Sequence, residues 1–486
     1  MESRVDNVAA LATLVAGRVV SGADVVVRDV THDSRQAGPG TLFVAVPGST
    51  HDGHDFVVDA VAAGSPAVMV EHSLKVSAAQ IVVPDTRQAM GPVAAAVHGW
   101  PTERLKLVGV TGTNGKTTVT HLVEAMVTGA GRASGLIGTV HTRVGAHSIP
   151  NTRTTPEATD FQRLIARMAD AGAEIVAAEV SSHALALGRV DAAHFAVVAF
   201  TNLTQDHLDF HGDMESYFAA KAQLFDPQRA EMAVVNVDDP AGRRLIDMLD
   251  IPFTSVGVGG DVSVGHVESG VESSRFEINT PVGGGEVVLP MGGRINVDNA
   301  ALAVGCALAV DVTLADAVDA LASFAGVPGR FEVVSGDDPV KVVVDYAHTP
   351  AGISQAIETA RAAGARRVVA VFGAGGDRDR EKRPRMGAAA SAADVVVVTS
   401  DNPRSEDPDA IVADVVAGAA DPGRLRADPD RRSAIQWAIE QARPGDVVLV
   451  LGRGHERGQE IGGRSLPFDD RLVARDALAA VRGIAR

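Results

Sequence analysis

Residues 105–118, LKLVGVTGTNGKTT, combine an apolar stretch, a glycine-rich turn and the expected start of a helix. In parallel α/β sheets, a strand that enters such a turn and then a helix forms a phosphate-binding loop. Gly112 and Gly115 let backbone N–H groups face the phosphate oxygens. Lys116 supplies positive charge for the β- and γ-phosphates, and the hydroxyl of Thr117 can bind Mg²⁺. The pattern predicts an enzyme that uses ATP.

The loop departs from the common NTPase spacing, which requires a glycine where Val110 stands, but it keeps the final Gly-Lys-Thr. A chance match would leave two glycines at the start of an ordinary helix, which they would weaken. We therefore expect the loop to surround the phosphates of ATP with Gly112, Thr113, Asn114, Gly115, Lys116, Thr117 and Thr118.

Composition limits the possible functions. With 486 residues, 46% of them hydrophobic, the chain can fill the cores of roughly three domains of ~150 residues. A formal net charge of -17 argues against nucleic-acid binding and favours a small-molecule substrate. The single Cys306 excludes an internal disulfide and a cysteine-based zinc site, and its apolar neighbours predict a buried thiol.

The chain has no segment of the ~20 apolar residues that a membrane span needs, and its first residues do not have the pattern of a leader. We expect a cytoplasmic monomer without nucleic-acid or membrane-inserted partners.

The pattern of strands and helices predicts an α/β fold with three domains: residues 1–101, 102–327 and 328–486. The first boundary follows from the end of a helical pattern at Pro101, and the second from the Pro-Gly interruption in VPGRFE. In the central domain we expect a P-loop-type ATPase with a largely parallel sheet, and in the last domain a doubly wound, Rossmann-like sheet. Expected strands are 175–178, 196–200, 232–235, 340–345, 368–372, 395–399 and 447–451, with hairpins in the glycine-rich stretch 257–285.

Polar or glycine-rich segments follow the strands expected in the last domain: DYAHTP, GAGGDRDREKRP, SDNPRSEDP and GRGHERGQE. Each alone could be an ordinary turn. Four of them at the carboxyl ends of neighbouring strands predict a ligand site, because that edge of a doubly wound sheet is where ligands bind.

In the central domain, Glu179 follows one expected strand and His207 follows the next. Such groups can converge on Mg²⁺, which prefers oxygen ligands and retains several waters. A lone histidine is more often a packing or capping residue, so His207 has two interpretations. Lys221 lies on a helix expected to begin near Met214 and, by itself, fits a surface lysine whose stem covers apolar side chains.

Ten motifs occur in a fixed order: GTNGKTT, RTTPEA, EVSSHALALGRV, TNLTQDHLDFHGD, AAKAQLF, GRINVDNAALA, VPGRFE, VVDYAHTP, GGDRDREKRP and DNPRSEDP. This order resembles that of the Mur ligases, over nearly the whole chain. Within the family the sequence is similar to members that add meso-diaminopimelate to UDP-N-acetylmuramoyl-L-alanyl-D-glutamate in peptidoglycan synthesis.

The resemblance implies that ATP phosphorylates a substrate carboxylate and that an amine attacks the resulting acyl phosphate. It implies catalytic roles for Lys116, Glu179, His207 and Lys221. Magnesium ligands would be Thr117, Glu179, His207 and Lys221, the last after carbamylation by CO₂. It also assigns to ATP the side chains of Asn299, Arg330 and Asp345, which come from two domains, so domain closure is expected.

For the UDP-linked substrate the resemblance implies contacts from Ser34, Thr154, Thr155, Ser181, Arg189 and Lys221. Leu187 departs from relatives that have glutamine there. The incoming amino acid would contact Arg378, Asp401, Asn402, Pro403, Arg404, Gly452 and Glu456. Arg404 could pair in a bidentate manner with the distal carboxylate that distinguishes diaminopimelate from lysine. An Asx-Pro turn would explain residues 401–403 without giving a reason for the arginine. A second departure is Arg453, where many relatives have lysine.

Other functions remain open at this level. A lysine-adding or folylpolyglutamate-type ligase would share the phosphate loop and the Lys221 region, but we do not expect DNPR beside this first domain in either. A nucleotide-dependent regulatory protein without ligase activity would be expected to lack one or more of the catalytic residues. Release of ADP that requires both the muramoyl-dipeptide and an amino acid would distinguish these possibilities.

Overall fold

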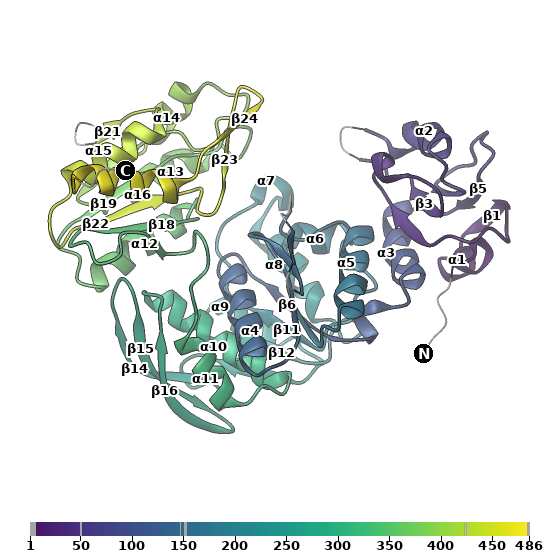
Figure 1. The fold of residues 1–486 in the computed structure, drawn as a ribbon, viewed down its shortest axis with the longest axis horizontal. Coiled ribbons are helices and arrows are strands. Elements are labelled where there is room, and N and C mark those ends of the chain that lie inside the picture. Colours follow the sequence, from purple (N-terminus) through teal and green to yellow (C-terminus); the bar gives the residue numbers. More distant parts are fainter. Residues whose placement is uncertain are drawn as a thin grey trace.

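The computed structural model describes residues 6–48, 51–145, 147–149, 153–421, 423 and 425–483. Three α/β domains follow one another along the molecule (Figure 1), with the first and last at opposite ends and the central domain between them. The fold class expected from the sequence is confirmed.

The N-terminal domain is built on a sheet in the strand order β1-β5-β4-β3-β2. Strands β2 to β5 pair in parallel, and β1 is antiparallel to β5. The elements are α1 (Val8–Leu14), β1 (Arg18–Ser21), β2 (Asp29–Thr31), η1 (Ser34–Gln36), β3 (Thr41–Val44), η2 (Gly53–Phe56), α2 (Val57–Ala62), β4 (Ala67–Val70), β5 (Ala79–Val82), α3 (Thr86–Val97) and η3 (Pro101–Glu103).

The central sheet has the order β13-β12-β11-β6-β10-β7-β8-β9. All pairs from β13 to β7 are parallel, and β8 and β9 extend the β7 edge as antiparallel strands that sequence analysis did not predict. Its strands are β6 (Lys106–Thr111), β7 (Ser134–Ile137), β8 (Thr142–Val144), β9 (His147–Ile149), β10 (Ile175–Glu179), β11 (Val197–Phe200), β12 (Ala233–Asn236) and β13 (Phe253–Val256). The helical elements are α4 (Lys116–Gly129), α5 (Ala158–Asp170), α6 (Ser182–Ala186), α7 (Leu208–His211), α8 (Met214–Ala222), η4 (Gln223–Phe225), α9 (Pro240–Ile246), α10 (Arg294–Ala309) and α11 (Leu314–Ala322).

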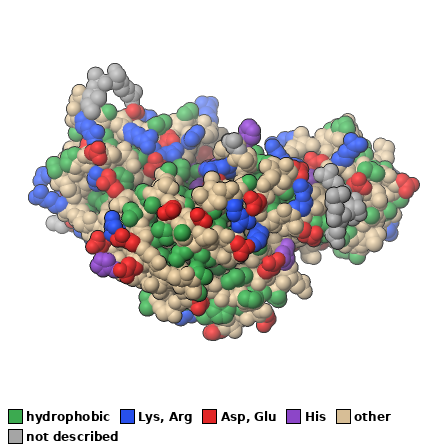
Figure 2. Space-filling model, turned by 60° about the horizontal axis from the view of Figure 1, so that its bottom comes forward, with side chains coloured by type: hydrophobic (Ala, Val, Ile, Leu, Met, Phe, Trp, Pro, Cys, Tyr) green, Lys and Arg blue, Asp and Glu red, His purple; other side chains and the backbone are tan. Residues whose placement is uncertain are grey.

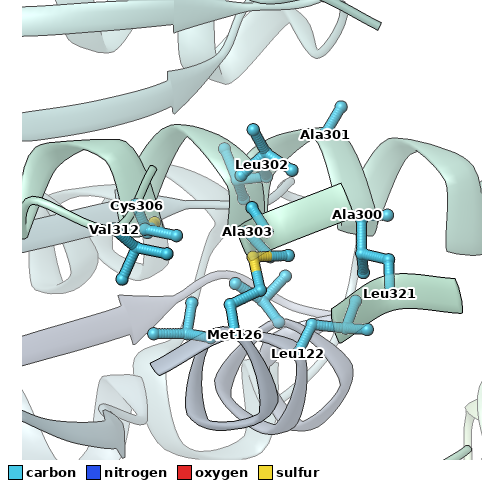
Figure 3. Packing of buried hydrophobic residues seen from close by; sticks show 14 of the residues in the cluster. Leu122, Met126, Ala300, Ala301, Leu302, Ala303, Cys306, Val312 and Leu321 are labelled. Carbon is cyan, nitrogen blue, oxygen red and sulfur yellow. The ribbon is translucent and has the colours of Figure 1, made fainter. Parts of the chain in front are cut away.

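Alternating side chains of the central strands fill two separate cores. In β10, Ile175 and Ala177 belong to the core beneath α4, α10 and α11, whereas Val176 and Ala178 belong to the core on the opposite face. A strand buried on both faces has this apolar run because helices cover the sheet on each side. Figure 3 shows the first core, where Met126 of α4 packs against α10. The single cysteine, Cys306, is buried there, as expected.

The glycine-rich stretch forms an antiparallel sheet, as the sequence analysis predicted. It consists of β14 (Ser263–Ser269), β15 (Ser274–Thr280) and β16 (Gly283–Leu289). In Figure 1 this sheet forms the lower left edge of the central domain, beside α10 and α11.

The C-terminal sheet has the order β17-β18-β22-β19-β20-β21 and is parallel from β18 to β21. One core lies under α12, α13 and α14, and the other under α15 and α16, so the sheet is doubly wound as predicted. The elements are β17 (Glu332–Val333), β18 (Lys341–Asp345), α12 (Pro350–Ala362), β19 (Val368–Phe372), α13 (Lys382–Ala390), β20 (Val395–Val398), α14 (Pro408–Val416), β21 (Arg426–Ala427), α15 (Arg431–Gln441), β22 (Val447–Leu451), β23 (Gly458–Ile461), β24 (Arg464–Pro467) and α16 (Asp470–Val481).

Surface charge is mixed on the face shown in Figure 2, where acidic and basic side chains are interspersed. Among the residues that the structure describes, no helix is both long and apolar enough to span a membrane.

Candidate active site

The glycine-rich turn joins β6 to α4 at the carboxyl edge of the central sheet. Gly112 and Gly115 adopt φ values of 144° and 87°, a region that L side chains rarely occupy. The side chain of Lys116 folds back over the turn, and its Nζ donates to the carbonyl oxygens of Gly112 at 2.9 Å and Thr113 at 2.8 Å. The turn therefore places the Lys116 amine at a helix N-terminus, an arrangement that suits a phosphate group.

Glu179 is the last residue of β10, in parallel register with Val110 of β6. Its Oε2 accepts a hydrogen bond from Thr117 Oγ1 at 3.0 Å, and its Oε1 accepts one from the backbone N–H of Thr139 at 2.6 Å. The hydroxyl of Thr139 also lies 3.0 Å from Glu179 Oε2. A hydroxyl and a carboxylate thus converge beside the phosphate loop, and this oxygen donor set fits Mg²⁺.

His207 follows β11 at the same edge of the sheet, with its Nε2 3.4 Å from Asp206 Oδ2. Loss of hydration lowers the pKa of His207 to about 4, although Asp206 opposes this shift and Lys116 adds to it. The imidazole is therefore neutral at pH 7, the form that can bind a metal. In the described part of the chain no three His, Cys, Asp or Glu side chains form a metal cluster, so a magnesium ion here would rely on hydroxyl groups and waters as well.

Lys221 is buried, with 1% of its surface exposed, so the interpretation as a surface lysine is wrong. Helix α8 begins at Met214 as expected and carries Lys221 Nζ to within 2.8 Å of the carbonyl oxygen of Gly112. The Nζ also lies 4.4 Å from the centre of the Tyr217 ring. Burial, together with the positive charge of Lys116, lowers the pKa of Lys221 well below its usual value. The phosphate loop thus has a second amine from a distant helix.

A cavity of about 240 Å³ lies between the central and C-terminal domains, above the phosphate loop. Lys116, Glu179, His207, Asn299, Arg330 and Asp345 all line this cavity. Arg330 links its two sides, because its guanidinium donates to Thr117 Oγ1 at 2.9 Å and lies 4.5 Å from the centre of the Tyr346 ring. Asp345 orders the connecting segment by accepting from the N–H groups of Phe331 and Ala347. All of the predicted ATP residues except Gly112 therefore line this one cavity.

The residues expected to bind a muramoyl-dipeptide form a connected group beside Glu179. Thr155 Oγ1 donates to the carbonyl oxygen of Glu179 at 2.8 Å and accepts from the N–H of Ser181 at 3.1 Å. Thr154 Oγ1 lies 3.0 Å from the hydroxyl of Thr139. Arg189 donates to the carbonyl oxygen of Thr155 at 3.4 Å.

Two further positions singled out in the sequence are Ser34 and Leu187. Ser34 begins η1 in the N-terminal domain, whereas the connected group belongs to the central domain. Leu187, the position that departs from relatives, directly follows α6 and is half-buried.

The DNPR segment and GRGHE meet at the carboxyl edge of the last sheet. Asn402 donates to Glu456 Oε2 at 2.8 Å and accepts from the N–H of Glu460 at 2.9 Å. Asp401 Oδ2 is buried without a hydrogen-bond partner among the described residues, and a side chain at Gly452 would collide with it at 2.6 Å. Burial and the charge of Asp401 raise the pKa of Glu456. Because the carboxylates of Asp401 and Glu456 are both poorly hydrated, this place favours a cationic ligand.

Arg404 follows Pro403 and stands at the edge of a cavity of about 770 Å³, with a quarter of its side chain exposed. Its guanidinium donates to the carbonyl oxygen of Gly376 at 2.7 Å and lies 3.2 Å from Glu460 Oε2. Arg378 is exposed nearby: a Cβ placed on Gly375 would lie 3.0 Å from Arg404 Nη1 and 3.8 Å from Arg378 Cγ.

Arg453, the other departure from relatives, is buried, with its Nε 3.6 Å from Glu456 Oε2. The positive charge that a lysine would bring is therefore kept at this position.

Sequence analysis missed some residues of the site. Thr139 holds Glu179 and lines both the cavity above the phosphate loop and the cavity at Arg404. Tyr346 and His348 line the first of these cavities. The sequence did carry a signal for Tyr346 and His348, because both lie in the polar segment DYAHTP after a strand. Thr139 lies in a turn after β7 that has no distinctive sequence pattern.

The chain is similar to known proteins over most of its length. Family models described as "Mur ligase family, catalytic domain", "Mur ligase middle domain" and "Mur ligase, glutamate ligase domain" match residues 26–98, 110–307 and 329–454. A protein of Geobacillus thermodenitrificans named UDP-N-acetylmuramoyl-L-alanyl-D-glutamate--2,6-diaminopimelate ligase is 47% identical, over 92% of this chain and 94% of its own.

A Streptomyces avermitilis protein of the same name is 44% identical, over 95% of this chain and 94% of its own. A solved structure of a ligase with that name superposes with a TM-score of 0.68 and 33% sequence identity, and the match covers 95% of this chain and 97% of the other.

Proposed function

The chain belongs to the Mur ligase family, and from this we propose that it adds meso-2,6-diaminopimelate to UDP-N-acetylmuramoyl-L-alanyl-D-glutamate with consumption of ATP, in peptidoglycan precursor synthesis. One observation supports this most directly: Thr139 lines both the cavity above the phosphate loop and the cavity at Arg404. A carboxylate activated in the first cavity would therefore be within reach of an amine held in the second.

ATP supplies the γ-phosphoryl group, which is transferred to the substrate carboxylate with loss of ADP. Lys116, at the start of α4, would offset the negative charge on the transferred group. Thr117 and Glu179 would hold Mg²⁺ through oxygen atoms, and His207 would add a neutral nitrogen. Asn299, Arg330 and Asp345 would hold the nucleotide between the domains.

We propose that Lys221 is carbamylated. Its lowered pKa favours the neutral amine, whose lone pair can attack CO₂ to form an N–C bond while the nitrogen loses a proton. The product is a carboxylate beside Gly112, able to bind a second Mg²⁺ and to lie near the substrate. An ammonium at this place would repel that ion.

The UDP-linked substrate would extend from the N-terminal domain to Glu179. Ser34 would contact the uracil end. The group formed by Thr154, Thr155, Ser181 and Arg189 would bind the muramoyl-dipeptide end, where Arg189 can pair with a carboxylate.

Diaminopimelate would bind along the carboxyl edge of the last sheet. Asp401, Asn402 and Glu456 would hold the distal ammonium, which suits the raised pKa of Glu456 and the unpaired oxygen of Asp401. Arg404 and Arg378, on either side of Gly375, would bind the distal carboxylate, with Pro403 and Gly452 shaping the turn. Arg404 would exchange its present partners for this carboxylate.

We further propose domain boundaries at 1–101, 102–327 and 328–486, with a monomer acting in the cytoplasm. Pro101 begins a short turn between α3 and β6, and residue 327 lies between α11 and β17. A cytoplasmic location suits the two nucleotide substrates.

A lysine-adding ligase is the main alternative. Phosphate release from purified protein with ATP, Mg²⁺ and UDP-N-acetylmuramoyl-L-alanyl-D-glutamate, measured with meso-diaminopimelate or L-lysine, separates the two. Release with diaminopimelate only is expected, because lysine leaves Arg404 without its carboxylate partner. A preference for lysine would overturn the role of Arg404 but keep the ligase. No release with either amine would point to a folylpolyglutamate-type ligase or a non-catalytic regulatory protein.

A further inference from the structure

Glu157, directly before α5, lies between three arginines. Its Oε1 is 3.0 Å from Nη2 of Arg189, and its Oε2 is 3.3 Å from Nη1 of Arg87. Arg153 pairs with the same carboxylate through Oε1. Only 8% of the Glu157 side chain is exposed, so water screens these contacts weakly. We refer to these four residues as the Glu157 cluster.

The cluster joins two domains. Arg87 lies in the first turn of α3, in the N-terminal domain, whereas its partners belong to the central domain. Helices α3 and α5 also pack against each other. An ion pair across this boundary therefore connects the orientation of α3 to the side chain of Arg189.

Arg189 depends on the cluster for its position. Its guanidinium is held by Glu157 on one side and by the carbonyl oxygen of Thr155 at 3.4 Å on the other. Its Nε is buried and has no hydrogen-bond partner among the described residues. Burial lowers the pKa of Arg189, and the charges of Arg153 and Arg87 act in the same direction, whereas Glu157 opposes them. Without the carboxylate, the three guanidinium groups would repel one another.

The cluster carries three positive charges and one negative charge, in a chain whose formal net charge is -17. This excess lies next to Thr155, which is bonded to Glu179 and Ser181. A ligand anion placed here would offset the remaining charge and could use the free donor of Arg189.

We infer that Glu157 is a positioning residue: it fixes Arg189 for a carboxylate of the muramoyl-dipeptide and couples this contact to the N-terminal domain through Arg87. The inference rests on the proposed function, because it assigns the anion to that substrate. Glu157 itself contacts arginines and would repel the ligand carboxylate, so its role is indirect.

The test compares equilibrium binding of UDP-N-acetylmuramoyl-L-alanyl-D-glutamate and of UDP alone, measured by calorimetry on the full chain. Glu157→Gln is expected to raise Kd for the complete substrate ~10-fold, since one charge-assisted contact is lost. Kd for UDP, which lacks the dipeptide, and KM for ATP should each change less than ~2-fold. The cavity proposed for ATP has no residue of the Glu157 cluster in its lining, and Ser34, proposed to contact uracil, is not part of the cluster. Glu157→Asp keeps the charge and should restore part of the affinity.

A double-mutant cycle tests whether Glu157 acts through Arg189. In an Arg189→Ala background, Glu157→Gln should have almost no further effect on Kd for the complete substrate. An equal loss in both backgrounds would overturn the positioning role. The positioning role would also be overturned if Glu157→Gln reduced affinity for UDP as much as affinity for the complete substrate.

Two further variants separate positioning from damage to the fold. Arg87→Gln removes the ion pair by which the Glu157 cluster crosses the domain boundary but leaves Arg189 paired, and we expect a smaller rise in the same Kd. Glu174→Gln breaks a more exposed ion pair with Arg132 elsewhere in the central domain and should leave Kd unchanged. If wild-type protein bound UDP but not the complete substrate, the proposed function would fail together with this inference. Normal wild-type binding with unaffected Glu157→Gln and Arg87→Gln variants would overturn the inference alone.

Discussion

The Nζ of Lys221 donates to the carbonyl oxygen of Gly112 across 2.8 Å, although 109 residues separate them in the chain. The contact ties α8 to the phosphate loop, where Gly112 also accepts from Lys116 Nζ. Two amines thus share one carbonyl oxygen, and burial favours the neutral form of Lys221. The chemical state of Lys221 therefore bears directly on the site where phosphate would bind.

Replacing Lys221 with Ala is expected to abolish ligation, because no carboxylate could then form beside Gly112. Phosphate release in the presence of all three substrates measures this, and carbon-13 NMR after addition of labelled bicarbonate detects the carbamate in wild-type protein. Lys75→Ala, at an exposed lysine of the N-terminal domain, is the matched control. Normal turnover by Lys221→Ala would remove the carbamate hypothesis.

Arg404→Ala should raise KM for diaminopimelate far more than KM for ATP. The loss of a partner for a partly buried charge costs about 2 to 5 kcal/mol, equivalent to roughly 30- to 5000-fold in binding. Arg404→Lys should recover little, because a point charge cannot replace the planar fork of arginine. Arg464→Ala, at an exposed arginine of β24, should leave both constants unchanged. Equal rises in the two KM values would argue against the selectivity role.

Arg330→Ala is expected to raise KM for ATP about 10-fold or more, since it removes a hydrogen bond to Thr117 and a stacking contact with Tyr346 together. Initial rates at varied ATP concentrations provide the measurement. Tyr346→Ala should cause a smaller rise, because the hydrogen bond remains. An unchanged KM for ATP in Arg330→Ala would mean that the nucleotide does not use this link between the domains.

Acid should destabilise the fold partly through His121. Burial lowers the pKa of His121 to about 3, below its ordinary 6.5, while its Nδ1 remains bonded to the carbonyl oxygen of Thr117. Between pH 6.5 and 3, His121 is therefore protonated in the unfolded chain but neutral in the folded chain. The free energy of unfolding falls as the pH drops through this range. At pH 5 this amounts to about 2 kcal/mol relative to pH 7.

Urea unfolding of wild-type protein and His121→Asn at pH 7 and pH 5 measures this effect. The asparagine can keep the hydrogen bond to Thr117 without titrating, so the variant should lose less stability between the two pH values. His266→Asn, at an exposed histidine, should behave like wild type. Parallel losses in wild type and His121→Asn would contradict the assignment.

Local sequence patterns determined the phosphate loop, the strands of the last domain and the family of this protein. The turn GTNGKTT predicted the phosphate loop because glycine spacing sets backbone conformation within a few residues, as the φ values of Gly112 and Gly115 confirm. Runs of β-branched residues predicted the strands of the last domain, and β19 and β22 have the predicted bounds, because strands buried on both faces need such runs. The order of motifs indicated the family.

Tertiary structure alone decided which distant groups meet. Lys221 has the local pattern of a surface lysine, and only the packing of α8 against the phosphate loop buries it. Glu157 and Arg87 look like ordinary charged residues until α3 and α5 bring them together at a domain boundary. The order of the strands in the central sheet places Thr139 between two cavities. Side-chain contacts across such separations depend on how whole domains pack, and local sequence periodicity carries no information about them.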